Sequence, residues 1–188
     1  RFLIVLGTAY LFVGVLDLSH MFVYKGMGIL AVEGADHATQ TWLAARYMES
    51  LSLLLVPFLF HRRVKPNVVI VLYSAVTLVL FALIFPLDLF PRSYIPGVGL
   101  TYFKIVSEYV ICLILLAAGV AFYLRRAAVD PVMTRLLLAS IGFTIASEIA
   151  FTNYVSVYGP ANMTGHVLKI ISSYLVYRAI VAHGLLAP

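Results

Sequence analysis

Residues 44–60 read AARYMESLSLLLVPFLF, an apolar run that carries an arginine and a glutamate near its start. The rest of the chain is also strongly apolar: of its 188 residues 63% are hydrophobic and 11% are charged, and the mean hydropathy is +1.02. Charged residues make up about a quarter of an ordinary soluble domain. This composition therefore indicates a membrane protein, in which Arg46 and Glu49 have little water to solvate them.

Six apolar runs are long enough to cross a hydrocarbon layer of about 30 Å at about 1.5 Å per residue. They do not alternate polar and apolar residues as the strands of a membrane barrel would. Asp130 before Pro131 predicts a helix start, and residues 96–101 predict a turn before Thr101 opens a helix. The sequence predicts an all-α, polytopic membrane helix bundle in one domain, residues 1–188, with six transmembrane helices at roughly 2–24, 37–60, 67–90, 101–124, 131–155 and 164–186.

Basic residues gather in two of the connections between these runs. HRRVK at 61–65 contains three of them, and the segment 125–135 contains Arg125, Arg126 and Arg135. Connections rich in lysine and arginine stay in the cytoplasm, so we expect both ends of the chain to be cytoplasmic in a bacterial inner membrane. The formal net charge of +5 is then explained by loops and not by a surface for nucleic acid.

The three helices that should run in the same direction begin with similar polar residues. Each carries a basic residue (Arg46, Lys104 or Lys169) followed three and four positions later by glutamate or serine. Other helices carry polar residues at helical spacing, among them Asp17 with His20, and Glu148 within a series of every fourth residue from 140 to 152. Spacings of three and four place such residues on one helix face. We therefore expect a polar cluster that opens to the outside above an apolar inner half.

Two interpretations of this cluster remain open. A charged group costs about 2.5–3.5 kcal/mol at the centre of a membrane helix, so it is normally paired or lines a cavity. Pairing of Arg46 with Glu49, and of Lys104 with Glu108, would serve only to hold helices together. Carboxylates and histidines remain after those pairs form, which favours a ligand pocket. The candidate pocket residues are Asp17, His20, Arg46, Glu49, Lys104, Glu108, Glu148, His166 and Lys169.

Several occupants of such a pocket are compatible with these residue types. A divalent metal is one, although no HxxxH or ExxH spacing lies within a single helix, and Asp17 could orient a liganding His20. The three basic side chains could instead hold an acidic or quinone-like molecule; haem is another candidate cofactor, and a buried glutamate could respond to protons. The candidate metal ligands are His20, Glu108, Glu148 and His166.

Aromatic residues and catalytic motifs are less informative. Trp42 is expected in an aromatic belt at the outer membrane boundary, and Tyr10 and Tyr73 are expected to contact lipid or to fill space. The sequence contains no nucleophile elbow, phosphate loop or HExxH motif, so we predict that this domain is not an enzyme. The single cysteine, Cys112, excludes an internal disulfide framework.

Five segments together resemble the third type of bacterial membrane-associated sensor domain. They are DLSHMFVYKGMG (17–28), ATQTWLAARYMESLSLL (38–54), GVGLTYFKIVSEYVICLILL (97–116), SEIAFTNYVSVYG (147–159) and GHVLKIISSYLVYRAIV (165–181). The resemblance implies an N-terminal input module fused to histidine kinases or diguanylate cyclases, with a cytoplasmic output domain after residue 188. It adds Lys25 to the polar residues above, and signalling of this kind favours a homodimer.

The functional prediction combines the cluster with this resemblance. The domain would sit in the lipid bilayer, detect a small ligand, ion or proton in an outward-facing polar pocket, and signal through its last helix. Two alternatives use the same charges: a small transporter or ion channel, and an intramembrane enzyme. Transporters more often have helices broken at mid-membrane, and substrate transport or chemical turnover by the isolated domain would identify either one.

Overall fold

The computed structural model describes residues 2–24, 27, 29, 35–152 and 159–182. In this part of the chain the structure consists of helices, the connections between them and one small β-hairpin, which confirms the all-α prediction. The long helices are α1 (Phe2–Val23), α2 (Asp36–Leu55), α3 (Pro66–Ile84), α4 (Tyr102–Leu124), α5 (Pro131–Thr152) and α6 (Pro160–Tyr177). The short elements are η1 (Val56–Leu59), β1 (Tyr94–Ile95), β2 (Gly99–Leu100), η2 (Arg126–Ala128) and η3 (Arg178–Ala182), the last a π-helical turn.

Five helices in the described part of the chain, α1 to α5, are long and apolar enough to cross a membrane, α2 doing so together with η1. The sixth predicted span is present as α6, which is 18 residues long and packs along α5. It begins at Pro160, four residues earlier than expected, and it carries His166 and Lys169 in its first half. With these polar residues, α6 is not among the five helices that are long and apolar enough to cross a membrane.

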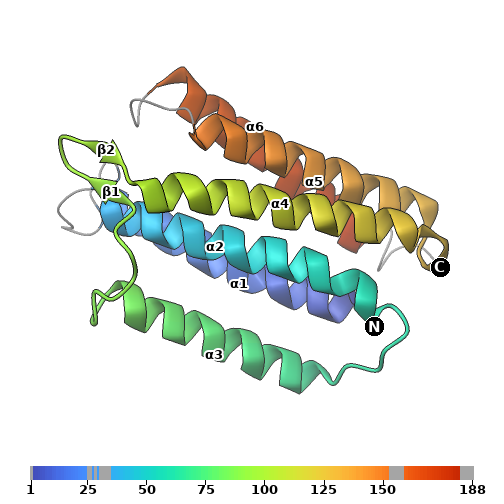
Figure 1. Ribbon diagram of the computed structural model, residues 1–188. Coiled ribbons are helices and arrows are strands. Elements are labelled where there is room, and N and C mark those ends of the chain that lie inside the picture. Colours follow the sequence, from blue (N-terminus) through green and yellow to red (C-terminus); the bar gives the residue numbers. More distant parts are fainter. Residues whose placement is uncertain (1, 25–26, 28, 30–34, 153–158, 183–188) are drawn as a thin grey trace.

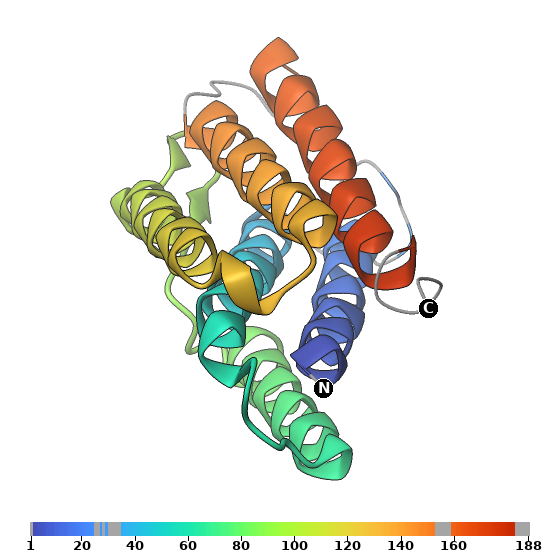
Figure 2. The same cartoon turned by 90° about the vertical axis from the view of Figure 1, so that its right-hand side faces the viewer.

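The long helices lie side by side with α2 in the middle of the bundle (Figures 1 and 2). α2 contacts α1 and α4, α4 contacts α5, and α5 contacts α6. Most of α2 is buried inside the protein, whereas α3 packs mainly on α1 and leaves most of its apolar surface exposed. The exposed apolar surface of α3 is suited to contact with lipid. The burial of α2 keeps its polar residues away from lipid.

The connections divide between the two ends of the bundle. The first helix begins and the last helix ends at the same end as the two basic connections, 61–65 and 125–130 (Figure 1). The β1–β2 hairpin lies at the opposite end, where Gly97 and Gly99 adopt positive φ angles of 79° and 103°. Asp36, at the start of α2, fastens this hairpin because its Oδ1 accepts the backbone N–H groups of Ser93 (2.7 Å) and Tyr94 (2.8 Å).

The predicted helix starts are confirmed by their hydrogen bonds. The side chain of Thr101 accepts the backbone N–H of Lys104 at 3.2 Å and so caps α4. Asp130 Oδ1 accepts the N–H groups of Val132 and Met133 at 2.9 Å each, ahead of Pro131 in the first turn of α5. These caps accept hydrogen bonds from backbone N–H groups in the first turn of each helix, which have no acceptor within the helix.

Candidate functional site

A chain of ion pairs joins three helices at the level of Arg46. The guanidinium of Arg46, fully buried on α2, binds both carboxylate oxygens of Asp17 on α1, with 2.6 Å from Nη2 to Oδ2. Its Nη1 donates to Glu49 Oε2 at 2.6 Å. Glu49 also pairs with Lys169 on α6 and accepts the hydroxyl of Tyr10 on α1 at 2.9 Å. We call Asp17, Arg46, Glu49 and Lys169 the ion-pair chain.

A second group of polar contacts joins α4 to α5. Lys104 and Glu108 form an ion pair one helical turn apart. Lys104 Nζ also donates to the carbonyl oxygen of Phe151 at 3.0 Å, and the Thr152 hydroxyl donates to Glu108 Oε2 at 3.0 Å. Both pairs expected within single helices, Arg46 with Glu49 and Lys104 with Glu108, are therefore confirmed.

Glu148 lies on α5 between these two groups. Its side chain is completely buried and interacts electrostatically with Arg46 and Glu108. Neither of its carboxylate oxygens has a hydrogen-bond partner in the described part of the chain. Here three cations, Arg46, Lys104 and Lys169, face four carboxylates, Asp17, Glu49, Glu108 and Glu148. A buried carboxylate without hydrogen bonds is costly when ionised, so the charges balance when Glu148 carries a proton.

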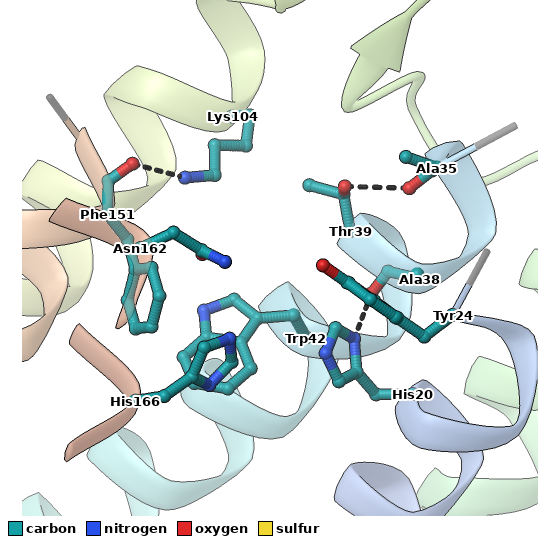
Figure 3. Close-up of a pocket in the computed structure, with 10 residues that line it drawn as sticks. All are labelled: His20, Tyr24, Ala35, Ala38, Thr39, Trp42, Lys104, Phe151, Asn162 and His166. Carbon is teal, nitrogen blue, oxygen red and sulfur yellow. Dashed lines mark hydrogen bonds between the residues drawn. The ribbon is translucent and has the colours of Figure 1, made fainter. Parts of the chain in front are cut away.

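Above the ion-pair chain, aromatic rings surround a small cavity of about 40 Å³, here called the aromatic hollow (Figure 3). The ring of Trp42 lies 4.7 Å from that of Phe151 and 5.5 Å from those of both His20 and His166. Lys104 reaches the rim beside Phe151. The full lining is His20, Tyr24, Ala35, Ala38, Thr39, Trp42, Lys104, Phe151, Asn162 and His166.

A wider opening of about 530 Å³ adjoins the aromatic hollow and lies between α1 and α6; we call it the α1–α6 groove. The two share five lining residues: His20, Tyr24, Trp42, Asn162 and His166. Asp17 and Lys169, the two ends of the ion-pair chain, also line the groove. Its size is within the usual range for small-molecule sites, roughly 300–1,000 Å³.

The nitrogen atoms around the hollow have a defined hydrogen-bonding state. His20 Nδ1 lies 2.7 Å from the carbonyl oxygen of Ala38. Because a carbonyl oxygen only accepts, Nδ1 carries the hydrogen, and Nε2 of the neutral ring is an acceptor. Trp42 Nε1 is buried with no hydrogen-bond partner among the described residues. The contacts of His166 there are with the rings of His20, Trp42 and Phe151.

The structure divides the nine predicted pocket residues by role. Four form the ion-pair chain, Lys104 and Glu108 form the α4 pair, Glu148 lies between, and the two histidines line the hollow. Asp17 does not orient His20: it binds Arg46, and the Ala38 carbonyl holds His20. Lys25 lies outside the described residues.

The four candidate metal ligands do not form one set. Among the described residues no group of three or more histidine, cysteine, aspartate or glutamate side chains is placed to hold a metal ion. Glu108 is engaged by Lys104 and Thr152, and His20 Nδ1 is engaged by a carbonyl. The donor geometry of the described residues therefore does not fit a metal.

Three aromatic residues have roles that were not expected from the sequence. Trp42 is not in a boundary belt: 7% of it is exposed, and the Arg46 guanidinium lies 4.6 Å from its ring centroid. Tyr10 donates to Glu49, and the hydroxyl of Tyr73 lies 2.6 Å from that of Ser52. The spacing of four between Trp42 and Arg46 was a usable signal, because residues so spaced meet on one helix face.

Comparison with known proteins identifies the family of this chain. No curated protein and no solved structure matches the chain. A family model described as MASE3, membrane-associated sensor domain, matches residues 1–188, which is the whole chain. The resemblance found in the sequence is thereby confirmed, and the apolar helices suit a protein that lies in the membrane. The chain belongs to the MASE3 family of membrane-associated sensor domains.

Proposed function

We propose that this chain is a sensory input domain of a bacterial inner membrane that binds a small ligand or ion from the outer half of the bundle. Binding in the α1–α6 groove would change the ion-pair chain, and α6 would pass the change to a cytoplasmic histidine kinase or diguanylate cyclase. A sensor domain is not itself catalytic, so catalysis is assigned to that output domain. Both ends of the chain are proposed to be cytoplasmic because the basic connections lie at their end of the bundle.

The observation that carries this proposal is that the ion-pair chain begins and ends in the groove. Asp17 on α1 and Lys169 on α6 line the groove, and Arg46 and Glu49 join them through α2. The Asp17 side chain is 37% exposed, so a ligand can reach it without opening the bundle. A ligand that changes the ion pair of Asp17 or of Lys169 alters the attraction that holds α6 toward α1 and α2.

The C-terminal end of α6 is the part of the helix through which a change in this force can be passed on. α6 continues into η3, which contacts α1 and α5 at the end of the bundle that carries the basic connections. π-helical turns recur at functional positions because their hydrogen bonding is less regular than that of an α-helix. A ligand shifts such a system only if it binds one arrangement of α6 more tightly than the other.

The test uses the full-length protein in membrane vesicles, with the rate of its output reaction as the readout. Lys169→Met and Glu49→Gln break the ion-pair chain on either side of its α2–α6 contact and are expected to shift the basal output rate in the same direction. Arg62→Met, in the exposed 61–65 connection, removes one charge without touching the chain and should leave the rate unchanged.

Folding must be separated from signalling in this test. Each variant is therefore compared with the parent by thermal unfolding and by size-exclusion profile after extraction. Well-folded variants at both Lys169 and Glu49 with a parental output rate would contradict the proposed role of the ion-pair chain.

A further inference from the structure

We infer that the α1–α6 groove binds a neutral, lipid-soluble ring molecule of the quinone and hydroquinone class, with its ring against Trp42, His20 and His166. The inference rests on the proposed function, since it names the ligand class of the same site. It follows from four properties of the groove: its aromatic wall, the unpaired indole N–H of Trp42, its paired charges, and the side from which it opens.

The wall of the groove is suited to a flat ring. Trp42, His20, His166 and Tyr24 all line it, and the three rings other than Tyr24 lie 5.5–6.4 Å apart between centroids. Aromatic rings pack favourably in offset or edge-to-face arrangements at such separations, and a planar ligand extends the same packing. Figure 3 shows these rings gathered around one space, next to which the groove lies.

The polar atoms of this wall match the oxygens of a quinone or hydroquinone. Trp42 Nε1–H is a buried donor with no acceptor among the described residues, and leaving such a group unpaired costs free energy. His20 Nε2 is an acceptor, because Nδ1 is turned to the Ala38 carbonyl. A ring oxygen can accept from Trp42, and the hydroxyl of the reduced form can also donate to a histidine nitrogen.

The charges of the groove favour a neutral ligand over an ion. Asp17 is bound by Arg46, and Lys169 is bound by Glu49. An anion would have to take Lys169 from Glu49, and a cation would have to take Asp17 from Arg46, each leaving a charge behind in a buried place. A neutral molecule with hydrogen-bonding oxygens avoids both losses, and by packing beside Asp17 and Lys169 it can shift the ion-pair chain without breaking it.

The opening of the groove faces the surface that lipid covers. Met21 on α1 and Ile170 on α6 line the groove and are 47% and 69% exposed. Apolar side chains exposed on membrane helices face acyl chains, so a ligand enters between α1 and α6 from the bilayer. An apolar tail can then remain in lipid while the ring occupies the wall described above.

Binding can be followed at a single position, because Trp42 is the only tryptophan in the chain. The chain is reconstituted in vesicles of phosphatidylethanolamine and phosphatidylglycerol and titrated with decylubiquinone, which quenches indole fluorescence. The matched control carries Trp42→Phe with Val71→Trp, which moves the reporter to an exposed position on α3. We expect saturable quenching in the parent and linear, collisional quenching in the control.

Variants test whether the wall of the groove is responsible. His166→Leu is expected to weaken binding by about five- to tenfold, the effect of losing roughly one hydrogen bond. His61→Leu, which removes an exposed histidine in the 61–65 connection, should bind like the parent. If His166→Leu unfolds on extraction, His166→Gln keeps a polar side chain but removes the ring and is expected to weaken binding in the same way.

The inference is overturned if quenching in the parent is as linear as in the α3 control. It is also overturned if decanol, which has the tail without the ring, displaces decylubiquinone at equal concentration, because the groove would then hold acyl chains. The proposed function is judged separately by the output rate of the full-length protein. Saturable binding with an output rate that never changes contradicts the sensing role, whereas absent binding with altered output in Lys169→Met contradicts only the ligand class.

Discussion

At the scale of single residues, the buried charges differ in how completely they are satisfied. Glu49 accepts from Arg46, Lys169 and Tyr10, whereas Glu148 accepts from no described residue. Removing one member of a buried ion pair is strongly destabilising, because the partner is left charged and unpaired. Two glutamates at similar burial should therefore respond in opposite ways to the same substitution.

The prediction is that Glu49→Gln lowers the free energy of unfolding by about 3–5 kcal/mol, while Glu148→Gln leaves it unchanged or raises it. The glutamine at 49 leaves two cations facing a neutral group, and the glutamine at 148 resembles the protonated acid. The measurement is thermal or denaturant unfolding of the extracted chain, followed by circular dichroism. If Glu148→Gln lowered the free energy of unfolding as much as Glu49→Gln does, Glu148 would have to be ionised and paired.

The sequence predicted these residues better than it predicted their partners. Pairs within one helix follow from spacing, which is why Arg46–Glu49 and Lys104–Glu108 could be foreseen. The pairs between helices, Asp17 with Arg46 and Glu49 with Lys169, depend on how each helix is rotated about its axis. Nothing in the order of residues fixes that rotation, so the two ends of the ion-pair chain emerged only from the fold.

At the scale of elements, α5 and α6 are joined by small and hydroxyl-bearing residues. The Ser172 hydroxyl lies 2.9 Å from that of Ser140 and 2.6 Å from that of Thr144, and Ser147 donates to the carbonyl oxygen of Gly165 at 2.8 Å. Small residues let membrane helices approach closely, and hydroxyl groups bind across the contact. α6 is therefore held on α5 independently of the ion-pair chain.

Two series of helical spacing in the sequence of α6 are candidates for its buried face. One series is His166, Lys169, Ser173 and Tyr177, and the other is Gly165, Lys169, Ser172 and Val176, which is the series that the structure buries. Both series have helical spacing, so periodicity alone could not choose between them. Gly165 was the useful signal, since a glycine inside a helix often marks a close approach of a neighbour.

The prediction at this scale concerns that close approach. A Cβ on residue 165 would lie 2.6 Å from the ring of Phe151, so Gly165→Ala is expected to lower the unfolding temperature. Phe151→Leu should recover part of this loss in the double variant, because a smaller side chain gives the new methyl group room. The control is Gly142→Ala on α5, where an added Cβ meets no described atom within 4 Å. Additive effects at 165 and 151 would show that the two residues do not interact.

At the scale of the whole molecule, the distribution of charge predicts how the bundle lies in the membrane. The basic connections 61–65 and 125–130 lie at one end, and the hairpin that carries Val98 lies at the other. The positive-inside rule then predicts that the hairpin lies outside the cytoplasm. The number and order of helices could be foreseen from apolar runs, whereas the central place of α2 could not, because its neighbours in sequence are only some of its neighbours in space.

This orientation is tested by labelling single cysteines in intact cells with a maleimide that does not cross membranes. Val98→Cys and His61→Cys, both in a Cys112→Ser background, change neither lysine nor arginine and so leave the orienting charges in place. Position 98 is expected to react in intact cells, and position 61 only after the cells are permeabilised. The opposite pattern would invert the orientation and place the α1–α6 groove in the inner leaflet.

The buried position of α2 also has a consequence for how the chain enters the membrane. α2 is the least hydrophobic of the five candidate spans, and Arg46 and Glu49 each oppose its transfer from the translocon into lipid. Asp17 is already present on α1 when α2 emerges, and a carboxylate bound to Arg46 lets the two helices leave the translocon as a pair. A substitution at Asp17 should therefore first reduce the amount of protein integrated into the membrane, before any change in signal can be seen.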